Sequence, residues 1–181
     1  MSVKRFATCL AAIAAIAPGI AQAKEAPCLT PAEFSSLAAY SLPNVIQGTK
    51  ARCAQTLGPE SFLRTEGDRL SAAYGARKSL AWPSAKAAFI RMSAGSNEQA
   101  NSVLKELPDE SLKPMLDLVI EGMVSQQISL KECRTLDRFV RLLAPLPPEN
   151  MAELITLVVI QAGKSKKEGE AAARKLTVCE S

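Results

Sequence analysis

Four cysteines carry most of the chemistry that this sequence offers. Cys28, Cys53, Cys133 and Cys179 are spread along the chain, a fifth (Cys9) lies in an apolar N-terminal run, and histidine is absent. Without histidine the chain lacks the commonest general base and metal ligand, which excludes Ser-His-Asp and Cys-His mechanisms. Zinc sites usually draw on close C-x-x-C pairs, and no such pair occurs here. The cysteines therefore predict two disulfides, with no metal ion and no cofactor.

Four cysteines allow three pairings, and two of the possible bridges each close within one region of the chain. We expect Cys28 to pair with Cys53 and Cys133 to pair with Cys179, because each pair would close one predicted helical hairpin. Loop closure of this kind stabilises a fold by about 3 to 4 kcal/mol for each bridge. That is a sizeable share of a typical free energy of unfolding of about 5 to 15 kcal/mol.

Two short patterns are compatible with enzymatic chemistry. Ser102 and Lys105 fit the S-x-x-K pattern of serine enzymes that act on peptidoglycan, but the S-D-N and K-T-G elements of those enzymes are absent. Glu60 precedes a serine, and Tyr74 lies in an Ala-Tyr-Gly sequence. These residues partly resemble the Glu-Ser pair and the Ala-Tyr-Asn element of lytic transglycosylases, in which Glu60 would be the general acid. Because Tyr74 follows too closely and the Asn is missing, a peptidoglycan-acting enzyme that uses Glu60 is the weakest of the alternatives.

The first 23 residues have the three parts of a secretory signal. Lys4 and Arg5 precede an apolar run over residues 6–16, and Ala-Gln-Ala at 21–23 supplies the small residues of a cleavage site. The run is shorter than the roughly 20 residues that span a bilayer. We therefore expect a Sec-type signal peptide over 1–23, with cleavage after Ala23.

Cleavage would leave residues 24–181 as a single domain with an even number of cysteines, as is typical of chains in the periplasm or outside the cell. The net charge is +4, and the leader carries two of the positive charges. This balance is too close to neutral to indicate binding to nucleic acid. The basic cluster at 164–167 is followed by glutamates, which favours a solvated helix end. We expect no transmembrane segment after cleavage.

Helix signals dominate the chain after Cys28. Thr30, Pro31 and Glu33 form a capping box with proline at the first helical position. A β-branched run at 155–160 is assigned to a helix, because no alternating partner strand is visible. With Pro and Gly as boundaries, the predicted helices cover 30–41, 44–57, 60–80, segments starting at Pro83 and Ser96, 107–128, 129–146, 147–163 and a short stretch before Cys179.

These elements predict an all-α fold of about seven or eight helices, either a helical bundle or a short stack of helical hairpins. Segments 107–128 and 129–146 are expected to pair as one hairpin. Segments 107–120 and 146–159 also resemble each other at an offset of 39 residues, near the period of helical-hairpin repeats. Chance similarity between Leu- and Val-rich helices with Pro-Glu starts is the favoured explanation of the resemblance, and a stack of hairpins is the alternative.

Three arginines give one predicted helix a basic face. Arg134, Arg138 and Arg141 recur at three- and four-residue intervals. We expect a solvated face whose arginines pair with nearby carboxylates, and an acidic partner is the alternative. Trp82, next to a proline, is expected to anchor two helices together. Aromatic residues make up only 4% of the chain, which argues against a stacking platform for sugars or bases.

The lack of a coherent catalytic set favours a non-catalytic interaction or accessory protein of the cell envelope, with an envelope protein as its partner. A carrier of a small apolar ligand held between helices is an alternative. An interaction protein should expose an apolar or single-sign patch of several hundred Å², on the order of the largest patches on monomers. A carrier should enclose a pocket of roughly 300 Å³ or more. The sequence does not indicate an oligomeric state.

Overall fold

The chain folds into α-helices throughout the part that the structure describes. The computed structural model describes residues 28–94, 98–165 and 178–179, so the predicted signal peptide and its cleavage site, the predicted cap at Ser96 and the predicted short last helix lie outside it. The described residues form eight α-helices and no β-strand, which confirms the all-α prediction. The helices are α1 Pro31–Cys53, α2 Phe62–Thr65, α3 Gly67–Gly75, α4 Lys78–Ala94, α5 Glu98–Glu106, α6 Asp109–Gln127, α7 Cys133–Leu143 and α8 Pro148–Ser165, with a 3-10 helix at Leu130–Glu132.

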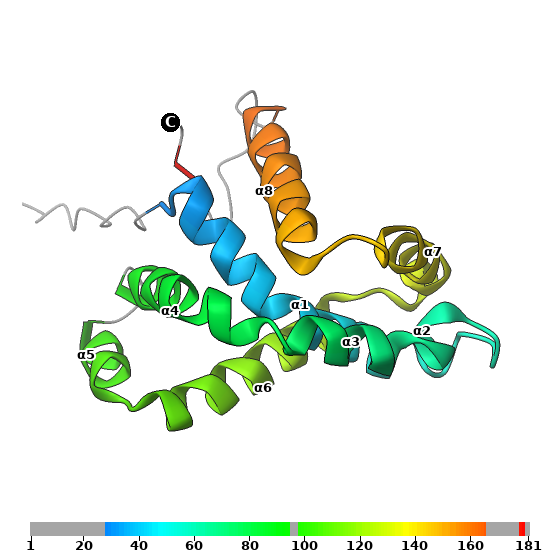
Figure 1. Cartoon of the computed structure of the whole chain (residues 1–181), viewed down its shortest axis with the longest axis horizontal. Coiled ribbons are helices and arrows are strands. Elements are labelled where there is room, and N and C mark those ends of the chain that lie inside the picture. The colour runs from blue at the N-terminus through cyan, green and yellow to red at the C-terminus, as the bar shows by residue number, and fades with distance from the viewer. Residues whose placement is uncertain (1–27, 95–97, 166–177, 180–181) are drawn as a thin grey trace, which may run out of the picture.

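Helix α1 is the centre of the fold. α3, α4, α6 and α8 all pack against it (Figure 1). Its capping box forms as predicted, because the Glu33 amide donates to Thr30 Oγ1 at 3.2 Å and the Thr30 amide donates to Glu33 Oε2 at 2.9 Å. Buried residues occur around the helix and not along one stripe, as expected for a helix with neighbours on several sides.

The helix break predicted at Pro43 is wrong. α1 continues through Pro43, which is buried, and α4 likewise continues through Pro83. A proline inside a helix costs about 3 kcal/mol. Packing of the surrounding helices along α1 offsets this cost, and the Ser71 hydroxyl donates to the Pro43 carbonyl oxygen at 3.0 Å. Propensity alone therefore placed helix boundaries where tertiary packing maintains continuous helices.

The predicted disulfide pairing is also wrong. Cys28 is bonded to Cys179, with Cα atoms 5.1 Å apart, and Cys53 is bonded to Cys133, with Cα atoms 5.4 Å apart. Because α1 is one helix of 23 residues, its two ends lie roughly 35 Å apart. Cys28 precedes the first end and Cys53 lies at the second, so these two cysteines cannot meet.

Two apolar clusters lie beside α1. One joins α1 to α4 and α6, and the other joins α1 to α3, α7 and α8. The first contains Tyr40, Trp82, Ala85, Leu112, Leu116 and Ile120. The second contains Leu42, Ile46, Cys53, Leu57, Leu63, Tyr74, Cys133, Met151 and Ala152.

The predicted hairpin of 107–128 with 129–146 does not form. Both helices exist, but α6 packs on α1 whereas α7 packs on α2. Ile128, the residue after α6, is extended, and it directs the chain away from α6 toward α7. The fold is therefore a bundle around α1 and not a stack of hairpins. The run 155–160 is helical within α8, as predicted.

Candidate interaction surface

The residues that suggested enzymatic chemistry do not lie in an enclosed site. Glu60 is exposed in the turn between α1 and α2, and Ser102 and Lys105 are exposed on α5. Tyr74 is buried, and its hydroxyl donates to the Leu146 carbonyl oxygen at 2.8 Å. Burial raises the pKa of Tyr74 above its ordinary value. The structure therefore gives Glu60 none of the enclosure that a general acid in a glycosidase needs.

Trp82 anchors two helices, as predicted. Its side chain is buried on α4, and Nε1 donates to Asp109 Oδ2 at the start of α6 at 2.6 Å. Lys86 Nζ donates to the other carboxylate oxygen at 2.6 Å. These two hydrogen bonds, that of Lys86 first, hold the pKa of Asp109 below its ordinary value. The Tyr40 ring lies 5.0 Å from the Trp82 ring, centroid to centroid. This polar group ties α4 to α6 over an apolar cluster.

Two surface hollows are too small and too open for a carrier of apolar molecules. One, of about 190 Å³, lies between α1, α4 and the start of α8 and includes the Arg77–Glu149 ion pair. The other, of about 260 Å³, lies between α1 and α6. Both volumes fall below the roughly 300 Å³ of typical ligand pockets. In the described residues, moreover, no three potential metal ligands gather, and no helix is both long and apolar enough for a membrane span.

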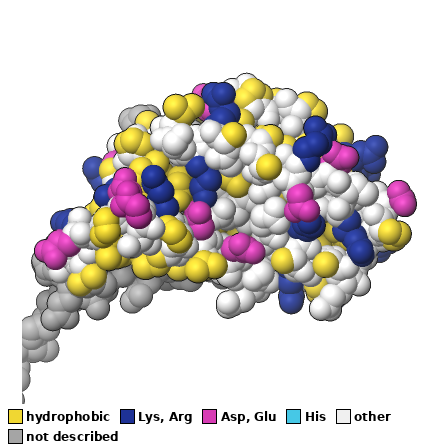
Figure 2. Space-filling model, turned by 60° about the horizontal axis from the view of Figure 1, so that its bottom comes forward, with side chains coloured by type: hydrophobic (Ala, Val, Ile, Leu, Met, Phe, Trp, Pro, Cys, Tyr) yellow, Lys and Arg dark blue, Asp and Glu magenta, His cyan; other side chains and the backbone are white. Residues whose placement is uncertain are grey.

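Large apolar side chains are exposed in groups on three helices, whereas Leu80, Val103 and Leu130 are exposed singly on other elements. Figure 2 shows hydrophobic side chains among scattered charges on the face that brings α5 and α6 forward. Single exposed leucines need no explanation, but clusters on one helix indicate contact surfaces. The clusters are Leu118, Val119 and Met123 on α6, Phe139 and Leu142 on α7, and Leu154, Leu157 and Val158 on α8.

The outer half of α7, that is, the side of the helix that faces solvent along its whole length, combines apolar and basic side chains. Phe139 is 59% exposed and Leu142 is 66% exposed. At about 100° per residue, the three arginines form a stripe along one edge of this outer half, and Phe139 and Leu142 form a second stripe beside it. The arginines (Arg134, Arg138 and Arg141) are all exposed, and none forms an ion pair with a described residue. The expectation that they pair with nearby carboxylates is therefore not met in this part of the chain.

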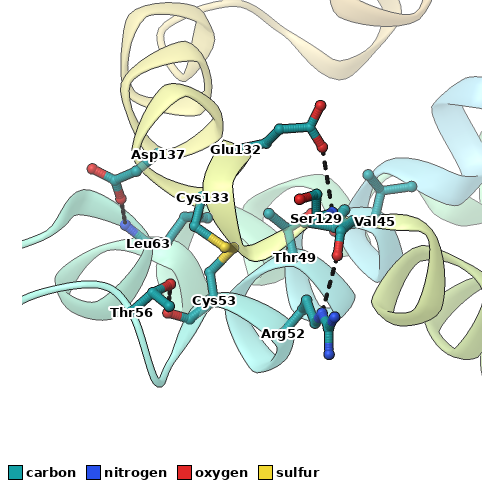
Figure 3. Close-up of a disulfide and its surroundings, with 11 residues drawn as sticks. Val45, Thr49, Arg52, Cys53, Thr56, Leu63, Ser129, Glu132, Cys133 and Asp137 are labelled. Carbon is teal, nitrogen blue, oxygen red and sulfur yellow. Dashed lines mark hydrogen bonds between the residues drawn. A yellow bond between two sulfur atoms is a disulfide. The ribbon is translucent and has the colours of Figure 1, made fainter.

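The inner half of α7, the side that faces the core, is held in place by a disulfide and a hydrogen bond (Figure 3). Cys133, the first residue of α7, is fully buried and bonded to Cys53, which is also fully buried at the end of α1. One turn further on, Asp137 Oδ1 accepts a hydrogen bond from the Leu63 amide of α2 at 2.7 Å. Both contacts face the core, so the opposite side of the helix must face outward.

The segment before α7 is held as well. Arg52 Nε of α1 donates to the Ile128 carbonyl oxygen at 3.0 Å, and the Ser129 amide donates to Glu132 Oε2 at 3.3 Å in a second capping box (Figure 3). These bonds fix the entry into the helix and thereby its rotation. The basic and apolar stripes thus occupy a defined position and not a mobile loop.

The outward direction of Phe139 and Leu142 was not predicted from the sequence. The signal for it was present, since a helical projection anchored on a buried Cys133 places both residues away from the core. Without the pairing of Cys133 with Cys53, nothing identified Cys133 as the inward residue.

No protein-family model, curated protein or solved structure matches this chain. The function is therefore inferred from the geometry of the chain itself.

Proposed function

We propose that this chain is an exported, non-catalytic interaction protein of the cell envelope, whose disulfide-bonded bundle presents helix faces to a protein partner. The observation that carries the proposal is the outer half of α7, where Phe139 and Leu142 lie exposed beside three arginines that form no ion pair with any residue the structure describes. Aromatic residues and arginine are enriched at the centres of protein interfaces, where a few residues supply most of the binding energy.

The energetics of exposure support this assignment. Burying a phenylalanine or leucine side chain stabilises a fold or a complex by about 1.5 to 3 kcal/mol. Side chains that stay exposed in the single chain can contribute this free energy when a partner covers them. Arginine suits such a surface because its planar guanidinium binds a carboxylate through two hydrogen bonds. The leader-like N-terminal sequence and the two disulfides support export, because disulfides persist in oxidising compartments.

Site-specific photo-crosslinking tests the interaction. A photoreactive amino acid at Leu142 in the native host is expected to give an adduct with one envelope protein. The matched control carries it at Lys105, an exposed residue of α5 outside the apolar clusters. The proposal fails if position 142 gives no adduct, or only the adducts that position 105 gives.

The mass of the chain recovered from its host tests export. We expect an N-terminus at Lys24 and two disulfides in the intact protein. A chain that retains residues 1–23 and four free thiols in addition to that of Cys9 would contradict this part of the proposal.

A further inference from the structure

We infer that the outer half of α7 binds the exposed face of α8 on a second copy of this chain, with the two helices antiparallel. This inference rests on the proposed function in one respect, the role of the α7 surface in binding. It goes further, because it names the partner.

The face of α8 that points away from α1 complements α7. Leu154, Leu157 and Val158 are 38%, 55% and 59% exposed, and they form an apolar stripe. Glu149 and Glu153 form an acidic stripe beside it. Glu149 already forms an ion pair with Arg77, whereas Glu153 is exposed and has no ion-pair partner in the described part of the chain. α8 thus presents an acidic and an apolar stripe where α7 presents a basic and an apolar one.

The order of the stripes determines the direction of pairing. With increasing rotation about the axis, at about 100° per residue, α7 presents first the arginines and then Leu142 and Phe139. In the same sense, α8 presents first Glu153 and then Leu157 and Leu154. Two faces with the same order match edge to edge only when one helix is reversed. Antiparallel packing therefore places arginine against glutamate and apolar side chains against each other, and it opposes the two helix dipoles favourably.

Within one copy, α7 does not reach this face of α8. The Cys53–Cys133 bond and the Asp137–Leu63 hydrogen bond hold α7 against α1 and α2, while α8 packs against α1. Figure 1 shows the two helices diverging from their connection. The complementary faces can therefore meet between copies.

A twofold dimer uses both faces of each copy. Each α7 would contact the α8 of the other copy, and twofold dimers are the commonest closed assembly. A stable interface buries about 800 Å² on each partner. Two helix–helix contacts related by symmetry bring more surface into the interface than either contact alone.

Sedimentation equilibrium of the oxidised chain from Lys24 onward tests the inference. We expect a dimer, about tenfold or more weaker association for Arg138→Glu and for Glu153→Arg, and recovery of most of the loss when both changes are combined. Phe139→Ala is expected to weaken association by a similar factor. Lys105→Glu on α5 makes the same charge change as Arg138→Glu and should leave association unchanged. Circular dichroism checks that every variant is folded.

Other results would overturn the inference. A chain that is monomeric at all accessible concentrations excludes the second copy as occupant. A dimer that Arg138→Glu and Glu153→Arg leave intact, or that the combined variant fails to restore, places the contact elsewhere. A monomer that binds vesicles of phosphatidylglycerol through Arg138 assigns the face to a lipid surface. A monomer in which a photoreactive group at Leu157 links to residues 166–177 assigns it to the same chain.

Failure of this inference and failure of the proposed function give different results. A monomer whose position 142 cross-links to an envelope protein retains the proposed function without the dimer. A chain that dimerises in solution but whose position 142 gives no adduct in the host retains the dimer and removes the role of the α7 surface in the envelope.

Discussion

Burial changes the pKa of single residues that pack between the helices of this protein. Tyr40 is almost completely buried, and burial, followed by the negative charge of Asp117, raises its pKa far above the ordinary value. Lys78 Nζ lies 4.2 Å from the centroid of the Tyr40 ring and donates to Asp117 at 2.6 Å. These groups bind one another, so the raised pKa marks a packed junction between α1, α4 and α6.

The two tyrosines predict a distinctive alkaline titration. Tyr40 and Tyr74 are the only tyrosines, and burial raises the pKa of both. Because the folded pKa values exceed the unfolded value of about 10, the stability they contribute is complete below that pH and is lost as the pH rises through the folded values. Absorbance at 295 nm should therefore show phenolate only at a higher pH than the value of about 10 at which a free tyrosine ionises, with Tyr40 the last to ionise. A gradual rise near pH 10, with unchanged circular dichroism, would contradict this.

At the scale of the helices, one glycine allows two of them to approach closely. A Cβ atom at Gly48 of α1 would lie 2.9 Å from the backbone oxygen of Glu121 and 3.2 Å from Val124 Cβ, both on α6. The absence of a side chain therefore lets the backbones of α1 and α6 approach closely.

Two glycine variants distinguish close approach from helix propensity. Gly48→Ala should lower the free energy of unfolding by about 1 to 3 kcal/mol, because the backbone of α6 must move. Gly122→Ala on α6 adds a methyl group with nothing within 4 Å. It should raise stability by up to about 1 kcal/mol, since alanine favours helix more than glycine. Urea denaturation measures the free energy of unfolding of both variants. Equal changes at the two positions would show that α1 and α6 do not approach each other as closely at Gly48 as the structure indicates.

The helices were predicted better than their boundaries and partners. The capping box at Thr30 fixes the start of α1 through local hydrogen bonds, so its prediction succeeded. Pro43 and Pro83 misled because the packing that keeps α1 and α4 continuous involves residues far away in sequence. That error also produced the wrong disulfides, since a broken α1 would have brought Cys53 back toward Cys28. The outer half of α7 was missed as well, because the sequence did not identify Cys133 as the residue of this helix that faces the core.

At the scale of the whole molecule, the two disulfides differ in their access to solvent. Cys53 and Cys133 are fully buried, whereas Cys28 and Cys179 are partly exposed beside a single β-bridge between Leu29 and Val178. A thiolate reductant must reach a sulfur atom to attack it. The Cys28–Cys179 disulfide, which joins the two ends of the described chain, is therefore more accessible to a reductant than the Cys53–Cys133 disulfide.

Partial reduction should separate the two bridges. Dithiothreitol in native buffer, followed by alkylation and peptide mass spectrometry, is expected to label Cys28 and Cys179 before Cys53 and Cys133. In concentrated urea the order should vanish, because burial no longer protects either bridge. Early labelling of Cys53 in native buffer would show that the core around α7 opens readily.

The nested connectivity has a consequence for biogenesis. A chain that enters an oxidising compartment N-terminus first presents Cys28 and then Cys53, whose native partners lie 151 and 80 residues further along the sequence. Pairing in order of arrival would join these first two thiols, a bond that the uninterrupted rod of α1 forbids in the mature fold. Correct maturation therefore depends on delayed oxidation or on thiol–disulfide exchange that reshuffles an early mispaired form.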